Sequence, residues 1–118
     1  MIDKRDLRIG NMFEQGIVFK ISGRAGAKVH LHGKGKRYKG FRTEVAVEHL
    51  KPIVLSPQVL VEWCGFDEIM PKVYALRELR LVWTPNGFMY GDKLLLTGLH
   101  ELQNLYHALN KKELEIKE

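Results

Sequence analysis

Positive charge is concentrated in one segment of the chain. Between Gln15 and Thr43 there are eight Lys and Arg residues and no Asp or Glu. The eight are Lys20, Arg24, Lys28, Lys34, Lys36, Arg37, Lys39 and Arg42. This segment carries +8, whereas the rest of the chain carries −3 of the net charge of +5. Such a field attracts phosphate polymers, acidic protein surfaces or anionic lipid without specifying a sequence.

Glycines and aromatic residues interleave with these cations. Gly33 and Gly35 favour a turn or a mobile loop, and Tyr38 and Phe41 follow within the basic run. Mobile cations release counterions when they bind phosphates, and exposed rings stack on bases. We therefore predict a nucleic-acid-binding site at Arg24, Lys28, Lys34, Lys36, Arg37, Tyr38, Lys39, Phe41 and Arg42. A solvated hairpin with its two aromatic rings in the core is one alternative, and a docking site for an acidic protein surface is the other.

The glycine-rich run is not a nucleotide-binding loop. GKGKRY lacks the third glycine of G-x-G-x-x-G, and no G-x-x-x-x-G-K-[ST] occurs in the chain. No base-reading motif occurs either, so we predict no sequence specificity.

Two histidines, His30 and His32, lie two residues apart and would share one face of a strand. A zinc site needs three or four ligands, and Cys64 has no nearby Cys or His at metal-binding spacing. Two solvent-facing histidines are the favoured interpretation, and we predict neither a metal nor another cofactor.

A second pair, His100 and His107, is seven residues apart, which is roughly 20° around a helix. Gln103 and Asn104 lie between them and complete a polar stripe. A solvated helix face is favoured over a partner-binding ridge. The chain has only two serines, neither in a nucleophile-elbow context, and Glu101 is the one carboxylate nearby. We predict that the protein is not an enzyme, a small hydrolase using one of these histidines being the weakest alternative.

The tryptophans bear on a different function. Trp63 and Cys64 fall on the apolar face of a predicted helix, where core packing is expected. Trp83 lies near a turn, and core burial is favoured for it also. An exposed patch around Trp83, Phe88 and Tyr90 would instead favour a protein-interaction module.

The length of 118 residues fits one domain spanning 1–118. Residues 1–55 are predicted to be mostly β, with a hairpin around Gln15-Gly16 and strands over 27–32 and 37–47. In the strand over 27–32, Val29 and Leu31 would face the core and the basic side chains would face away.

The second half contains the predicted helices. A short helix is expected over 56–66, capped by Ser56 and ended by Gly65. A β-hairpin over 73–96 turns at Thr84–Gly87, and a helix follows over 98–110, with a final edge strand over 113–116. The predicted fold class is α+β, with a small antiparallel sheet or SH3-like barrel on which two short helices pack.

Two motifs carry a resemblance. Leu7-Arg8-Ile9-Gly10-Asn11, followed by short strands, is similar to the entry of small SH3-like barrels. The sequence HELQNLYHAL over 100–109 resembles the C-terminal helix of small proteins encoded by phages and mobile elements of gut bacteria, and 51–56 with Gly65-Phe66 resembles their middle block. The chain departs from the group where Lys111 and Lys112 replace an expected glycine, and in its basic segment. The resemblance implies a phage-type accessory protein and implies no activity or cofactor.

The chain contains no apolar stretch long enough for a transmembrane helix, and MIDKRDLRIG places charges where a signal peptide is apolar. With a single cysteine, this predicts a cytoplasmic protein without a membrane partner. Nucleic acid or an acidic protein surface is the expected partner, and a homo-oligomer stays open. The predicted function is a non-catalytic accessory protein that binds nucleic acid or another polyanion; the alternative is a protein-interaction module, an inhibitor or adaptor of a host protein.

Overall fold

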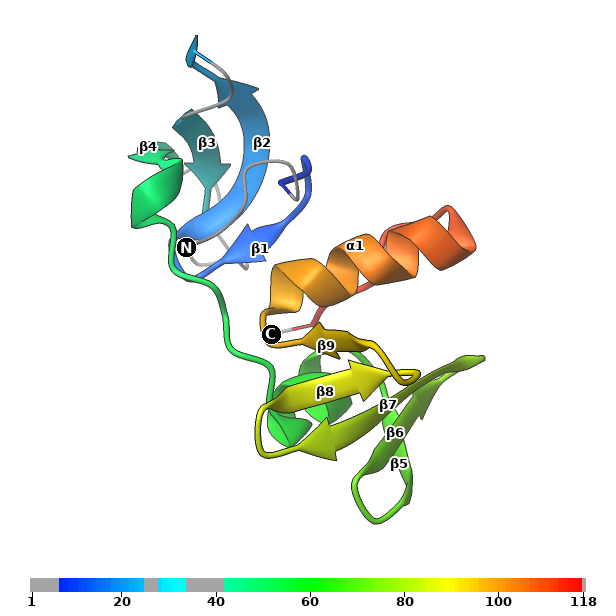
Figure 1. Cartoon of the computed structure of the whole chain (residues 1–118). Helices are drawn as coiled ribbons and strands as arrows, with labels where there is room; N and C mark the ends of the chain where they lie inside the picture. The colour runs from blue at the N-terminus through cyan, green and yellow to red at the C-terminus, as the bar shows by residue number, and fades with distance from the viewer. Residues whose placement is uncertain (1–6, 25–27, 34–41, 118) are drawn as a thin grey trace. The chain divides into compact units, whose positions relative to one another are not determined.

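The computed structural model describes residues 7–24, 28–33 and 42–117. The chain divides into two compact units, Met1–Ile53 (unit 1) and Val54–Glu118 (unit 2), and each is described by itself. The described residues form two antiparallel sheets and one α-helix (Figure 1). The α+β class is therefore confirmed in this coarse form, with two sheets in place of the one expected. The single-domain expectation stays a prediction.

Unit 1 contains a four-stranded antiparallel sheet in the order β1-β2-β3-β4 (Figure 1). The strands are β1 (Met12–Phe13), β2 (Gly16–Ser22), β3 (Lys28–His32) and β4 (Arg42–Ala46), and a 3-10 turn over Val47–His49 follows. The predicted hairpin around Gln15-Gly16 is present, because Phe13 pairs with Gly16. The predicted strand over 27–32 corresponds to β3.

The core of unit 1 lies on one face of this sheet. Val29 and Leu31 are fully buried, as the alternation in the sequence predicts, and Val18 joins them from β2. The buried side chains of this core are Leu7, Phe13, Val18, Val29, Leu31, Val47 and Leu50. The residues between them on β2, β3 and β4 must consequently face away from the core.

The chain after β4 returns to β1. Phe13 forms an isolated bridge with Pro52, and the Glu14 amide donates a hydrogen bond of 3.0 Å to the Lys51 carbonyl. The Gln15 side chain reinforces this return, since its amide nitrogen donates to the His49 carbonyl at 2.7 Å and its oxygen accepts from the Lys51 amide at 3.0 Å. These contacts fix the end of unit 1 beside its first strand.

Unit 2 contains a five-stranded antiparallel sheet whose strands pair in chain order (Figure 1). They are β5 (Asp67–Met70), β6 (Val73–Leu76), β7 (Leu79–Thr84), β8 (Gly87–Tyr90) and β9 (Leu94–Leu96). The predicted hairpin over 73–96 is thus four strands: the turn at Thr84–Gly87 is present, and the predicted strand over 73–83 is divided into β6 and β7. Strand β5 was not predicted, because all four of its residues are exposed and give no alternating pattern.

The predicted helix over 56–66 is a π-helical segment, Val59–Trp63. Ser56 Oγ accepts a hydrogen bond from the Val59 amide at 3.2 Å, and Gly65 takes the left-handed conformation at φ 79°, so both predicted ends hold. Between them, the Cys64 amide donates to the Val59 carbonyl five residues back. This spacing is that of a π-helix, so the second predicted α-helix is not confirmed.

Helix α1 (Leu99–Asn110) matches the predicted helix over 98–110. Glu101 Oε1 accepts hydrogen bonds from the Gly98 amide at 2.9 Å and from the Thr97 hydroxyl at 2.9 Å, which caps the first turn. The helix ends because Lys111 takes the left-handed conformation at φ 60°.

The residues after α1 form no strand over 113–116, contrary to expectation. The Lys117 amide instead donates a 2.7 Å hydrogen bond to the Trp63 carbonyl. The fully buried side chains of unit 2 come from the sheet, from α1 and from residues 60 and 66; they are Leu60, Phe66, Leu81, Phe88, Leu99 and Leu102.

Candidate nucleic-acid interface

The sheet face of unit 1 that points away from the core carries the strongest candidate site. We call it the outer face; it includes Phe19, Lys20, Ser22, Lys28, His30, His32, Arg42 and Glu44. Strand register places them together, because His32 pairs with Arg42 and His30 with Glu44 across β3 and β4. Their partners on β2 are Lys20, opposite His30, and Ser22, opposite Lys28. The hydrophobic alternation that builds the core therefore also builds this polar surface.

Phe19 occupies an irregularity in strand β2. The register shifts between Val18 and Lys20, which leaves Phe19 without a partner opposite it on β3. Because Phe19 follows the buried Val18, alternation places its side chain on the outer face, and the register shift places Lys20 on that face as well. The ring lies 6.1 Å from the His30 ring and 6.0 Å from the His32 ring, measured between centroids. Phe19 is thus a partly exposed ring on the outer face beside two imidazoles.

Arg42 lies over the Phe19 ring. Its guanidinium carbon is 5.2 Å from the ring centroid, within the range of a cation–π contact. Arg42 is exposed, so the guanidinium keeps donors available to other groups. The ring and the guanidinium together present a flat, positively charged surface.

One carboxylate lies on the outer face among the described residues. Glu44 Oε1 is 3.3 Å from Lys28 Nζ, and Glu44 Oε2 is 3.9 Å from His30 Nδ1. The other ring nitrogen of His30 lies 2.7 Å from Ser22 Oγ. Glu44 therefore offsets part of the positive charge at the Lys28 end of the face, whereas Lys20 has no ion-pair partner within the described part of the chain.

His32 is held by a local hydrogen bond. Its Nδ1 donates to the Gly33 carbonyl at 3.1 Å, which leaves Nε2 as an acceptor in the neutral ring. No group of three or more His, Cys, Asp or Glu residues gathers in the described ranges. His30 and His32 share a strand face as predicted, and their nearest aromatic neighbour there is Phe19.

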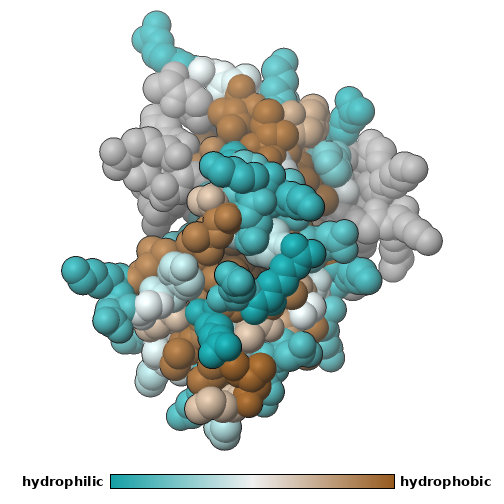
Figure 2. Space-filling view, turned by 90° about the vertical axis from the view of Figure 1, so that its right-hand side faces the viewer, coloured by the Kyte–Doolittle hydropathy of each residue, from teal (hydrophilic) through white to brown (hydrophobic). Residues whose placement is uncertain are grey.

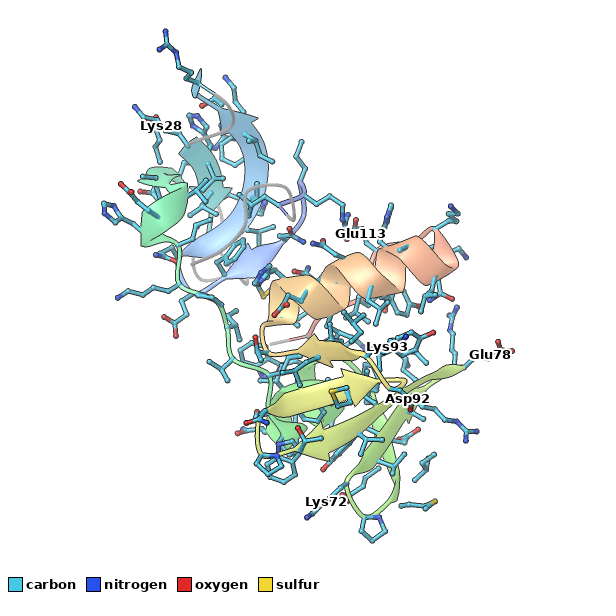
Figure 3. All side chains as sticks on the ribbon, in the orientation of Figure 1. Lys28, Lys72, Glu78, Asp92, Lys93 and Glu113 are labelled. Carbon is cyan, nitrogen blue, oxygen red and sulfur yellow. The ribbon has the colours of Figure 1, made fainter. Side chains whose placement is uncertain are left out.

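Three of the nine predicted site residues are described. Lys28 and Arg42 lie on the outer face, at opposite ends of it, and Figure 3 shows Lys28 extending from β3. Arg24 is exposed just beyond the end of β2. The other six, Lys34, Lys36, Arg37, Tyr38, Lys39 and Phe41, lie outside the described residues. These six residues lie in the sequence between His32 and Arg42, which pair with each other across β3 and β4.

Phe19 was missed by sequence reasoning, which sought stacking rings only between Arg24 and Arg42. Phe19 follows Val18 directly, and two adjacent apolar residues in a strand indicate one buried side chain and one exposed side chain without saying which. The register shift, which places Lys20 on the same face as the ring, leaves no signal in the sequence.

The histidine pair of α1 does not form the solvated stripe that was favoured. His100 is 5% exposed and Gln103 is 3% exposed, and His107 is partly buried. A groove of about 400 Å³ in unit 2 is lined by Trp63, Cys64, Tyr106 and their neighbours and includes neither histidine. The hydrolase alternative required a pocket joining a histidine to a carboxylate, and this groove does not supply one.

Cys64 is buried, as predicted from its place on the helix face. Burial raises the pKa of its thiol to about 12, so the thiolate is scarce at neutral pH. Trp83 is 42% exposed and stacks on the buried Phe88 ring, with 6.3 Å between ring centroids, which corrects the expectation of core burial for Trp83. Because Phe88 is fully buried, it does not belong to the exposed patch that the alternative function required.

Within the described ranges, no helix combines the length and the apolar character that crossing a bilayer requires. Compared with protein families, with characterised proteins and with solved structures, the chain gives no match. The resemblance to phage-encoded proteins stays a prediction.

Proposed function

We propose that the protein binds nucleic acid, or another polyanion, through unit 1 and without catalysis. The main observation in support is the unequal distribution of charge between the two units. Unit 1 holds 12 Lys and Arg against 5 Asp and Glu, whereas unit 2 holds 7 against 9. The net charges are accordingly +7 and −2. Concentrated cations attract a phosphate backbone and gain free energy by releasing its counterions.

The outer face supports this proposal. Lys20, Lys28 and Arg42 lie on it with a single described carboxylate, Glu44, and the basic segment between His32 and Arg42 begins and ends at it. Phosphate contacts by Lys and Arg position a protein on a nucleic acid without reading its sequence. An acidic protein surface would meet the same cations and is an outcome of the test below.

Three further parts of the proposal are a small SH3-like barrel, a phage-type origin and a cytoplasmic location. The bridge of Phe13 to Pro52 brings residues beyond β4 back to β1, which supports the barrel. The phage-type origin rests on the resemblance of 100–109, and the cytoplasmic location on the single cysteine, Cys64.

Fluorescence anisotropy with labelled DNA and RNA at several salt concentrations tests the function. If about four to six phosphates are neutralised, log K falls against log salt with a slope near −4 to −5. Replacing the four cations Lys34, Lys36, Arg37 and Lys39 with Glu should abolish binding. A matched control replaces the same number of cations in unit 2, namely Lys72, Arg77, Arg80 and Lys93, and should bind nearly as well as the wild type.

Two results contradict the proposal. In one, the wild type shows no binding at micromolar protein in low salt. In the other, both quadruple variants lose affinity equally, which would show a response to net charge alone. If the protein binds an acidic polypeptide with the same salt slope and does not bind nucleic acid, its function is protein docking.

A second function, a protein-interaction module, is favoured by an apolar row on unit 2. Cross-strand register aligns Met70, Val73, Val82, Met89 and Leu95 on the sheet face opposite to the buried Tyr74, Leu81 and Phe88. Met70 is 60% exposed and Val82 is 44% exposed. The face in Figure 2 shows hydrophobic side chains in separate patches among hydrophilic ones. An exposed apolar row is a feature of protein-binding surfaces.

Capture from nuclease-treated host lysate tests this second function. A partner retained by the wild type and lost by Val82→Lys, but kept by the control Arg80→Glu on the same strand, would support it. Equal capture by all three proteins would count against the row as the binding surface.

A further inference from the structure

We infer that the outer face of unit 1 is a stacking platform for unpaired nucleotides, with Phe19 as the ring on which a base stacks. This inference rests on the proposed function and names its ligand class, single-stranded nucleic acid. The structural basis is the placement of one partly exposed ring among cations and imidazoles on an open sheet face.

The exposure of Phe19 is the first step of the argument. A phenyl ring in a strand next to a core is ordinarily buried in that core, but Phe19 follows the buried Val18 and therefore lies on the opposite face of the sheet. There it contacts His30, His32 and the guanidinium of Arg42, all of which are polar. Ile17, opposite His32, lies on the outer face as well, whereas the core residues lie on the other face of the sheet. Because Arg42 lies over one face of the Phe19 ring, we expect a base to stack on the guanidinium plane or on the exposed part of the ring.

The surroundings of the ring identify the ligand as a nucleotide chain. Arg42 lies at one end of the face and Lys28 at the other, with Lys20 opposite His30 between them. Strand β3 spans five residues, so these cations are roughly 13 Å apart at their backbones. That distance is about two steps between successive phosphates of an extended strand, so a base between the contacted phosphates can reach the ring.

The same arrangement favours a single strand over a duplex. In a duplex the faces of each base are covered by its neighbours, and stacking on a protein ring requires an unpaired, splayed base. The His32 ring lies beside Phe19, and its Nε2 can bond to base edges without demanding one base, because Nδ1 already donates to the Gly33 carbonyl. We expect little sequence preference.

The test compares Phe19→Leu with the wild type by anisotropy, using a labelled oligo(dT) of about 16 nucleotides and a duplex of equal length. Leucine keeps an apolar side chain and removes the π-face. We expect Phe19→Leu to bind oligo(dT) about tenfold more weakly, with an unchanged salt slope and unchanged affinity for the duplex. Tyr90→Leu, an aromatic replacement on unit 2 at a similarly half-buried position, is the control and should bind like the wild type.

A second variant guards against a folding defect. Phe19→Trp restores the ring, so it should regain wild-type affinity, and its added indole fluorescence should be quenched by oligo(dT) and not by the duplex. The inference is overturned if a folded Phe19→Leu protein binds oligo(dT) as tightly as the wild type, or if oligo(dT) does not quench Phe19→Trp. The proposed function still holds in that case, provided that the wild type binds nucleic acid with the expected salt dependence. Absence of all nucleic-acid binding by the wild type removes both.

Discussion

Lys28 and Glu44 form an ion pair across strands β3 and β4, with 3.3 Å between Nζ and Oε1. The pair is diagonal in the ladder, because Lys28 lies opposite Ala46 and Glu44 lies opposite His30. Both side chains are about half exposed, at 58% and 48%, so the pair stabilises the fold by less than about 1 kcal/mol. Its larger effect is on the charge of the outer face.

Replacing Glu44 with Gln should strengthen nucleic-acid binding. The change removes the carboxylate that repels phosphates and frees Lys28 to contact them, so we expect roughly a two- to fivefold lower Kd at low salt and a smaller gain at high salt. Anisotropy titrations measure it. Glu48→Gln, in the 3-10 turn of the same unit, removes the same charge away from the sheet face and should change the Kd less. Equal gains from both variants would show that only net charge matters.

Alanine at Gly16 should destabilise the fold more than alanine at Gly65. A Cβ on Gly16 would overlap the carbonyl oxygen of His32 on the neighbouring strand, and backbone cannot move aside cheaply. A Cβ on Gly65 would meet no atom within 4 Å, so only its positive φ is strained, at about 1 kcal/mol. Thermal unfolding of both variants measures the difference. A Gly16→Ala protein as stable as Gly65→Ala would mean that β2 and β3 separate easily at this point.

Removing the carboxylate of Glu101 should destabilise helix α1. Oε1 accepts hydrogen bonds from Thr97 and from the Gly98 amide, and loss of such a cap costs about 1 kcal/mol. We expect Glu101→Ala to lower the denaturant midpoint, whereas Glu115→Ala, at an exposed position after the helix, should leave it nearly unchanged. A similar midpoint for the two variants would contradict the capping role.

The thiol of Cys64 should be unreactive in the folded protein. Because burial raises its pKa to about 12, a disulfide reagent at mildly alkaline pH should react slowly until denaturant is added. The time course of thiol release, with and without denaturant, measures this. Rapid, complete reaction under native conditions would contradict the buried environment of Cys64.

The raised pKa of Cys64 also makes the stability depend on pH in a defined direction. A solvent-exposed cysteine thiol ordinarily has a pKa near 9.0, so above that pH an unfolded chain loses a proton that the folded chain keeps up to about pH 12. The free energy of unfolding should therefore fall as pH rises through this window and be unaffected by this group below it. Denaturation of the wild type and of Cys64→Ala at a series of pH values measures the contribution, since the variant should lose less stability on alkaline titration.

Local capping and turn chemistry could be predicted from the sequence, and irregular backbone could not. Ser56 and Gly65 mark the true ends of a helical segment, although its π-type spacing is not encoded in them. The split of residues 73–83 into two strands was missed because the turn between β6 and β7 uses Arg77 at φ 57°. Arginine is not a residue that signals a left-handed turn.

For the candidate site, charge was predictable and shape was not. The basic segment is visible in the sequence, and the structure places Lys28 and Arg42 from it on one face. Lys20 lies on that face beside Phe19 because of a one-residue register shift, which arises only when β2 pairs with β3. Register shifts of this kind depend on how two strands pair in the folded protein, so the pattern of residues along one strand does not predict them.

Strand order has a consequence for how the chain is made. In both sheets of the described chain, each strand pairs with the one that precedes it, from β1 to β4 and from β5 to β9. A growing polypeptide can therefore complete each ladder as soon as the next few residues leave the ribosome. Few strand edges then stay unpaired for long, which limits the time during which the nascent β-rich chain can aggregate.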